Sequence, residues 1–214
     1  MTRLPVANAA RTPIVCIVDD DASIREALSS LFRSVGLTVA AFGSAADFLT
    51  RENADAPGCL VLDVRLPGVS GLDFQTQLLA MENPLPIVFM TGYGDIPMSV
   101  RAMKAGALDF LAKPFRDQDM LDAVTNAIKR DAAGRRDADA LQTLRQAYAS
   151  LTPREREVMG HVTTGLMNKQ VGALLGLSEI TVKIHRGNVM RKMAARSLAE
   201  LVKMSEALGA HTSV

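Results

Sequence analysis

The sequence contains few of the residues that form disulfides or zinc sites. Its 214 residues include only two cysteines and three histidines. Cys16 and Cys59 both lie within apolar, strand-like runs, which favours buried reduced thiols over a disulfide or a metal site. We therefore expect a cytoplasmic protein whose metal ligands, where it has any, are oxygen atoms.

Long apolar segments are also missing. No run approaches the roughly 18 apolar residues that span a bilayer, and residues 1–11 lack the apolar core of a signal peptide. No internal repeat is present. We expect no membrane contact and a flexible tail over residues 1–12.

Charge is unevenly distributed along the chain. The formal net charge is only +1, but residues 1–128 carry 10 Lys and Arg against 15 Asp and Glu, and residues 129–214 carry 14 against 8. An acidic part joined to a basic part indicates that one binds a cation and the other a polyanion.

Residues 13–130 alternate short apolar runs with helical patterns, which is typical of a parallel sheet in an α/β domain. The buried helix stripes include Leu28 and Phe32 in the first helix and Leu121 and Val124 in the last. We predict a doubly wound, five-stranded parallel sheet with strands over residues 14–18, 37–42, 59–63, 86–91 and 108–112. The intervening helices are expected after Asp21, over 45–50, from Ser70 to about Met81, over 98–105 and from Asp117 to Ile128.

Ligands of such a sheet bind beyond the carboxyl ends of its strands. Those ends carry Asp19, Asp20, Asp63, Thr91 and Lys113. Clustered carboxylates repel one another unless a cation lies among them, and oxygen ligands suit Mg²⁺ better than zinc. A hydroxyl and an ammonium opposite these acids would suit a phosphoryl group, with Asp63 as its nucleophile. The alternative for each residue taken singly is a helix cap or a turn.

Four segments resemble the receiver domain of two-component response regulators: Val18-Asp19-Asp20-Asp21, residues 62–68 (LDVRLPG), Met90-Thr91-Gly92 and residues 110–115 (FLAKPF). The resemblance implies a flavodoxin-like sheet with strand order 2-1-3-4-5. It also implies that Asp63 accepts a phosphoryl group from the histidine of a sensor kinase.

The same resemblance implies further roles for these residues. Asp20, Asp63 and the backbone carbonyl of Arg65 would bind one Mg²⁺, and Asp19 would orient that metal through water. Thr91 and Phe110 would form a switch pair, and the Lys113–Pro114 bond would be cis. Without the resemblance, Phe110 reads equally well as an ordinary residue of an edge strand.

Residues 131–149 are rich in alanine and charge and predict a helical linker, with Gly134 as a candidate break. Leu141, Leu144, Tyr148 and Leu151 recur at helical spacing. This stripe could pair with a second copy in a dimer, pack on the chain's own domains, or stay exposed on a spacer.

Residues 150–214 predict a small all-α domain of four helices. Thr152-Pro153-Arg154-Glu155 combines an N-cap, a first-turn proline and a capping-box glutamate. A second helix is expected over 169–175, and Gly176-Leu177 forms a turn before Ser178 caps the third. A second capping box at Ser197 opens the fourth. Two helices joined by a glycine turn indicate a helix-turn-helix.

The helix after Ser178 is basic, with five Lys and Arg up to Arg196 against Glu179 alone. Such a run can be simply a solvated face, but after a helix-turn-helix glycine it favours DNA. Lys183 and Asn188 can read base edges. The residues better placed for phosphates are Thr181, Arg186, Arg191 and Lys192.

Residues 151–155 (LTPRE) and 181–186 (TVKIHR) resemble the LuxR-type helix-turn-helix, and the whole chain resembles the FixJ/NarL class of response regulators. The resemblance implies that Lys183 and Ile184 face bases and that the last helix forms a dimer contact on DNA. Gly187 replaces a long basic side chain of some relatives, so their base preference cannot be transferred.

These observations predict a transcription regulator whose binding to double-stranded promoter DNA, as a homodimer, is controlled by phosphorylation of Asp63. RNA polymerase is a further expected partner. We expect no enzymatic activity beyond the receiver's own phosphoryl transfer and dephosphorylation. Two alternatives stay open: a phosphatase or phosphotransferase acting on a diffusible substrate, and a DNA-binding protein that ignores phosphorylation.

Overall fold

We analysed a computed structural model of the chain, which describes residues 12–51, 56–80, 85–92 and 96–209. Of the expected tail over residues 1–12, only Thr12 lies within these residues. Met81, the expected end of the helix that starts at Ser70, lies outside them. The chain divides into two compact units, residues 1–135 and 136–214, called here the N-terminal and C-terminal units. None of the described helices is long and apolar enough to cross a bilayer.

The N-terminal unit contains the predicted parallel sheet, and its strand order β2-β1-β3-β4-β5 confirms the expected topology. Parallel strands need a crossover connection, and each crossover here is a helix or contains one. Every strand begins and ends within one residue of its predicted bounds. The strands are β1 (Ile14–Val18), β2 (Thr38–Phe42), β3 (Gly58–Asp63), β4 (Ile87–Thr91) and β5 (Asp109–Ala112).

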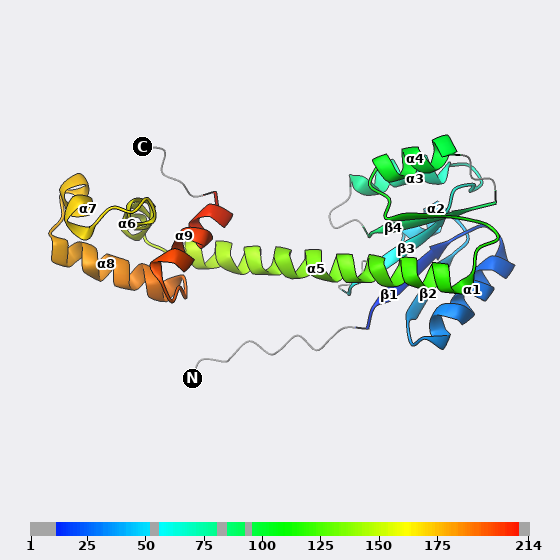
Figure 1. Cartoon of the computed structure of the whole chain (residues 1–214), viewed down its shortest axis with the longest axis horizontal. Helices are drawn as coiled ribbons and strands as arrows, with labels where there is room; N and C mark the ends of the chain where they lie inside the picture. Colours follow the sequence, from blue (N-terminus) through cyan, green and yellow to red (C-terminus); the bar gives the residue numbers. More distant parts are fainter. Residues whose placement is uncertain (1–11, 52–55, 81–84, 93–95, 210–214) are drawn as a thin grey trace. The chain divides into compact units, whose positions relative to one another are not determined.

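Helices cover both faces of this sheet (Figure 1). One face packs on α1 (Ala22–Ser34) and α5 (Asp117–Ala149) through Phe32, Met120 and Val124. The other packs on α2 (Ala45–Leu49), α3 (Gly71–Leu79) and α4 (Ile96–Lys104) through Phe48 and Phe74. The central strands β3 and β4 are buried along their whole length, as expected for strands covered on both faces.

Three helices differ from their predicted bounds by two residues or more. Helix α3 ends at Leu79 rather than at about Met81. Helix α4 begins at Ile96 rather than at 98. Helix α5 continues beyond Ile128 and passes through Gly134 without a break. A glycine inside a helix costs only about 1 kcal/mol relative to alanine, and the alanine- and arginine-rich flanks favour helix.

The C-terminal unit has α6 (Pro153–Thr163), α7 (Asn168–Leu175), α8 (Glu179–Lys192) and α9 (Leu198–Ala207). The predicted caps are present: the side chains of Thr152, Ser178 and Ser197 accept backbone N–H bonds at the starts of α6, α8 and α9. Gly176, with φ +67°, makes the left-handed turn between α7 and α8.

The core of this unit consists of the inner faces of its helices, including Val158, Val182 and Leu201. Leu144 and Tyr148, from the last turns of α5, pack against the same core. Of the three alternatives for the linker stripe, packing on the chain's own domain therefore holds for these two side chains and for Leu151, which is buried in the same core.

Candidate functional site

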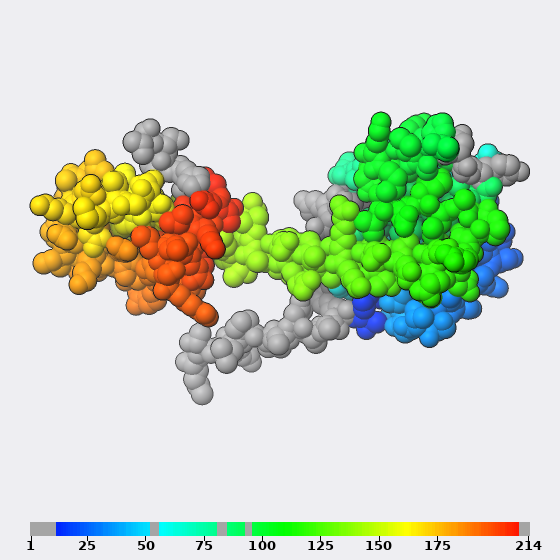
Figure 2. Space-filling view, in the orientation of Figure 1, coloured from blue at the N-terminus to red at the C-terminus, as the bar shows by residue number. Residues whose placement is uncertain are grey.

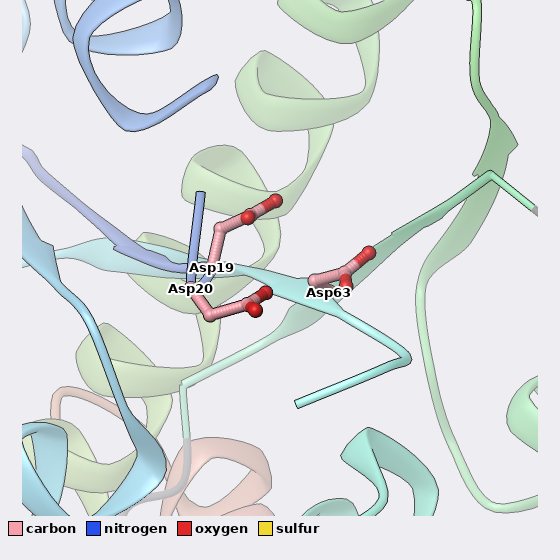
Figure 3. A group of neighbouring side chains, drawn as sticks. All are labelled: Asp19, Asp20 and Asp63. Carbon is pink, nitrogen blue, oxygen red and sulfur yellow. The ribbon is translucent and has the colours of Figure 1, made fainter. Parts of the chain in front are cut away.

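Three carboxylates meet at the carboxyl edge of the sheet. Asp19 and Asp20 follow β1, and Asp63 is the last residue of β3. Candidate ligand oxygens of the three lie within 4.8 Å of one another, with Asp19 and Asp63 buried and Asp20 exposed. Figure 3 shows these side chains next to each other, contributed by the ends of two neighbouring strands. The group offers oxygen donors on a partly open edge, which fits a hard divalent cation.

Lys113, which follows β5, lies beside two of these carboxylates. Its Nζ lies 2.8 Å from Asp19 Oδ2 and 3.2 Å from Asp63 Oδ1. Burial lowers the pKa of Lys113, but the bond to Asp19 and the charge of Asp63 outweigh this effect and raise it above its usual value. The ammonium therefore stays charged beside the two acids.

The surroundings of Asp63 disfavour the charged form of its carboxyl group. Burial raises the pKa of this carboxyl, and the charge of Asp19 adds to the rise, whereas Lys113 opposes it. Its Oδ2 accepts a hydrogen bond of 3.2 Å from the backbone N–H of Arg65. A second cation near Asp63 would offset the repulsion between the acids.

The backbone around Asp63 depends on a residue that the sequence analysis passed over. Gly71, the first residue of α3, donates its N–H to Val64 O at 2.8 Å and packs directly on the carbonyl oxygen of Asp63, where a Cβ atom would collide. No local signal marks this contact, because it joins a helix start to a strand end. Arg25, also missed, donates from Nη1 to the Asp19 carbonyl at 2.7 Å.

Thr91 and Phe110, the expected switch pair, come from adjacent strands. Thr91 ends β4 and is fully buried, and Phe110 in β5 is half-buried with its ring centroid 6.2 Å from that of Phe89. The backbone N–H of Lys113 donates to Thr91 O at 2.7 Å, which ties the ends of the two strands together. The Lys113–Pro114 bond is cis, as predicted.

The predicted DNA-contacting residues divide into two groups on α8, drawn in orange at the surface of the C-terminal unit in Figure 2. Lys183, Ile184 and Arg191 are exposed. The other four make contacts inside the unit. The Thr181 hydroxyl lies 2.8 Å from Ser178 Oγ, Asn188 Oδ1 accepts from Arg191 at 3.1 Å, and Arg186 donates to Asn168 Oδ1 at 3.3 Å.

Lys192, expected to contact a phosphate, has two partners within the unit. Its Nζ lies 2.6 Å from Glu155 Oε2 and 3.2 Å from Ser150 O. Glu155 is buried. Its bond to Lys192 is the main cause that holds the pKa of the carboxyl below its usual range, and the hydrogen bond from the backbone N–H of Thr152 is the second. This ammonium therefore joins the end of α8 to the start of α6.

The fold and these two sites define a class of protein. Its members have an α/β domain with a cluster of carboxylates and a lysine suited to a phosphoryl group, joined to a helix-turn-helix. Comparison with known families agrees. Residues 15–125 match the response regulator receiver domain, and residues 149–205 match the luxR family of bacterial regulatory proteins.

Relatives cover most of the chain. It is 59% identical over 202 residues to Nodulation protein W of Bradyrhizobium diazoefficiens. The matched region covers 94% of this chain and 89% of that protein. It is 48% identical to the response regulator protein TodT of Pseudomonas putida, over 92% of this chain and 87% of that one. The solved structure of the response regulator StyR shares 49% identity with a TM-score of 0.83, over 91% of this chain and 98% of that chain. The protein therefore belongs to the two-component response regulators that carry a LuxR-type DNA-binding domain, and it is a transcription regulator.

Proposed function

We propose that Asp63 accepts a phosphoryl group from the histidine of a partner sensor kinase and that this modification controls promoter binding. The observation that carries the proposal is the meeting of Asp63 with Asp19, Asp20 and Lys113 at one sheet edge. Asp63 supplies the attacking carboxylate oxygen, and its position at a strand end leaves that oxygen close to the charged Lys113.

The acidic group fits one Mg²⁺ per receiver, held by Asp20, Asp63 and the Arg65 carbonyl, with Asp19 beside them. The donors are all oxygen. The pKa of Asp63 is raised first by burial and then by the charge of Asp19, and a bound cation would offset that repulsion. When bound, the metal supplies positive charge that neutralises phosphoryl oxygens.

After transfer, Lys113 would exchange a carboxylate partner for a phosphoryl oxygen. Thr91 would donate its hydroxyl to another, and Phe110 would turn toward the space that the threonine leaves. Their adjacent strands and the bond between Lys113 N–H and Thr91 O support this coupling. A modification shifts such an equilibrium only as far as it stabilises one state over the other.

The DNA-binding unit would act as a homodimer on two half-sites about one helical turn apart. RNA polymerase would be the partner on activated promoters, and the cytoplasm the compartment. The basic, exposed Lys183 and Arg191 support a polyanion partner for this unit.

The decisive experiment is a genome-wide footprint of the wild type beside Asp63→Asn, with Asp73→Asn as the matched control. Asp73 is an exposed carboxylate in the first turn of α3 and lies outside the acidic group. We expect Asp63→Asn to lose kinase-dependent occupancy and Asp73→Asn to keep it. In vitro, beryllofluoride should tighten promoter binding by the wild type and by Asp73→Asn, but not by Asp63→Asn. Equal affinity with and without beryllofluoride would contradict the proposal.

We also propose that the protein does not turn over diffusible phosphoesters. Among the residues that the structure describes, and apart from Lys113 and the acids themselves, we assign no proton donor near Asp63 for a leaving group. The expected product of phosphorylation is one labile phosphoryl group per chain. Sustained release of phosphate from small phosphoesters would instead identify an enzyme.

A further inference from the structure

Helix α8 presents a mixed outward face. Residues at i, i+3, i+4, i+7 and i+11 share one side of a helix, and on α8 all five such positions are exposed: Ile180, Lys183, Ile184, Gly187 and Arg191. The opposite side carries the buried Val182 and Val189. The outward face, defined by these five residues, is therefore not a simple cationic surface.

Two isoleucines on this face are unusually open. Ile180 is 73% exposed and Ile184 is 59% exposed. Ile180 lies in the first turn of α8, the part of a recognition helix that reaches base edges. Because Lys183 and Arg191 lie on the same side, the occupant of this face carries negative charge as well as apolar groups. In the major groove the only apolar group on a base edge is the C5-methyl of thymine.

Gly187 supports a close approach to that occupant. It lies within the helix, where glycine costs about 1 kcal/mol relative to alanine, and no atom lies within 4 Å of where its Cβ would be. Packing within the unit therefore gives no reason for glycine here. A missing side chain on the outward face does leave room for a partner to lie against the helix backbone.

We propose that the outward face of α8 recognises thymine methyl groups, with Ile180 as a specificity-determining residue alongside Ile184. This inference rests on the proposed DNA-binding function. The two side chains are four residues apart, which is about 6 Å along the helix axis and close to two base-pair steps of roughly 3.4 Å each. We expect two required thymines, separated by one or two base pairs, in each half-site.

The test replaces thymine by deoxyuridine, which removes only the methyl group. Duplexes are first selected from a random library with the full-length, beryllofluoride-treated protein, and each thymine is then replaced in turn. Loss of one methyl contact should raise the Kd about fourfold, the factor expected for one buried methyl group. In the Ile180→Ala variant, replacing thymine by deoxyuridine at one of the two required positions should cause no further rise in Kd.

The matched control is Leu174→Ala, which removes a 63%-exposed side chain on α7 that is not part of the outward face. This variant should keep the wild-type response to every deoxyuridine. Identical deoxyuridine profiles for Ile180→Ala and the wild type would overturn the thymine assignment while leaving DNA binding intact. Failure of the wild type to enrich any sequence would defeat the DNA-binding function itself, and the inference with it.

Discussion

At the scale of single residues, the phosphoryl-type site is built by contacts between side chains and distant backbone. Asp63 depends on Gly71, where a Cβ atom would collide with the Asp63 carbonyl oxygen, and Asp19 depends on the hydrogen bond that Arg25 donates to its carbonyl. The geometry of the site therefore also rests on residues other than the carboxylates and Lys113.

Replacing Gly71 by alanine should disturb Asp63, the proposed phosphoacceptor. The new Cβ would collide with the Asp63 carbonyl oxygen, so the strand end must shift, at a cost of about 1–3 kcal/mol in the free energy of unfolding. We expect a lower Tm and slower labelling by a phosphorylated kinase. Gly43→Ala is the control, because its Cβ would meet nothing closer than 3.8 Å. Equal labelling of both variants would show that the contact is unimportant.

The Glu155–Lys192 pair should make the C-terminal unit sensitive to acid. The pKa of Glu155 is lowered in the folded state, so its contribution to stability is complete above its unfolded pKa of about 4.5 and is lost as the pH falls through the folded value. Glu155→Gln keeps an acceptor for the Thr152 N–H but loses the charge.

At pH 7 we expect Glu155→Gln to lower the free energy of unfolding of this unit by about 1–2 kcal/mol, with Lys192→Met giving a similar loss. Calorimetry of the full chain from pH 7 to pH 3 should show the gap between wild type and Glu155→Gln closing as the pH falls. A constant gap would rule out a contribution from the charge.

At the scale of elements, α4 is less firmly packed than its neighbours. Ala102 is its one buried residue among those described, and Ile96, Val100 and Met103 are largely exposed. Its carboxyl end is held by the buried Gln75 of α3, whose Nε2 donates to Ala102 O at 3.2 Å and to Ala105 O at 3.1 Å.

Replacing Gln75 by leucine should release this end of α4. The Ala105 carbonyl would lose the donor of Gln75, and the Ala102 carbonyl would keep only the N–H of Ala107. The cost should be about 1–3 kcal/mol, so amides of residues 101–106 should exchange faster with deuterium. Exchange across β3 should stay unchanged, which serves as the internal reference. Unaltered exchange at 101–106 would mean that side-chain packing alone fixes the helix.

Gly187→Ala separates folding from recognition on α8. Alanine should raise the free energy of unfolding by about 0.5–1 kcal/mol, because nothing occupies the space beside Gly187. The same change should weaken binding to selected duplexes, since the methyl group enlarges the outward face. A variant that is both more stable and equally tight in binding would show that the glycine has no role on DNA.

At the scale of the whole molecule, residues 136–214 carry 11 Lys and Arg against 7 Asp and Glu, and the remainder of the chain is acidic. DNA binding should therefore weaken steeply with salt. Arg191→Ala should reduce affinity for all sequences alike and lower the salt slope by about 1, whereas Lys183→Ala should relax preference at one base pair. Titrations at several salt concentrations on selected and random duplexes distinguish the two; matching slopes and preferences would contradict the division between bases and phosphates.

Much of this molecule could be predicted from the sequence because its signals are local. The apolar runs predicted the bounds of every strand to within one residue. Ligands of parallel sheets bind at the carboxyl ends of the strands, and this predicted that Asp19, Asp20, Asp63 and Lys113 meet at one edge. What could not be predicted depends on tertiary contacts. Lys192 and Glu155 are 37 positions apart, so a charged residue that looked suited to a phosphate is instead bonded inside the unit.

The continuous helix through Gly134 was missed for another reason. Glycine weakens a helix but does not end one, and flanking alanines can outweigh it. Ile180 had a usable signal, since it precedes Ile184 by one helical turn on a basic helix. Only the exposure of both side chains in the folded unit shows that neither is needed for the core.

The position of Lys113 has one more consequence. Its positive charge is bonded to two acids before any phosphoryl group arrives, so incoming negative charge meets a counterion already in place and little rearrangement is needed. In the unmodified receiver this ammonium offsets one of the three carboxylate charges, and phosphorylation would replace one of its carboxylate partners by a phosphoryl oxygen.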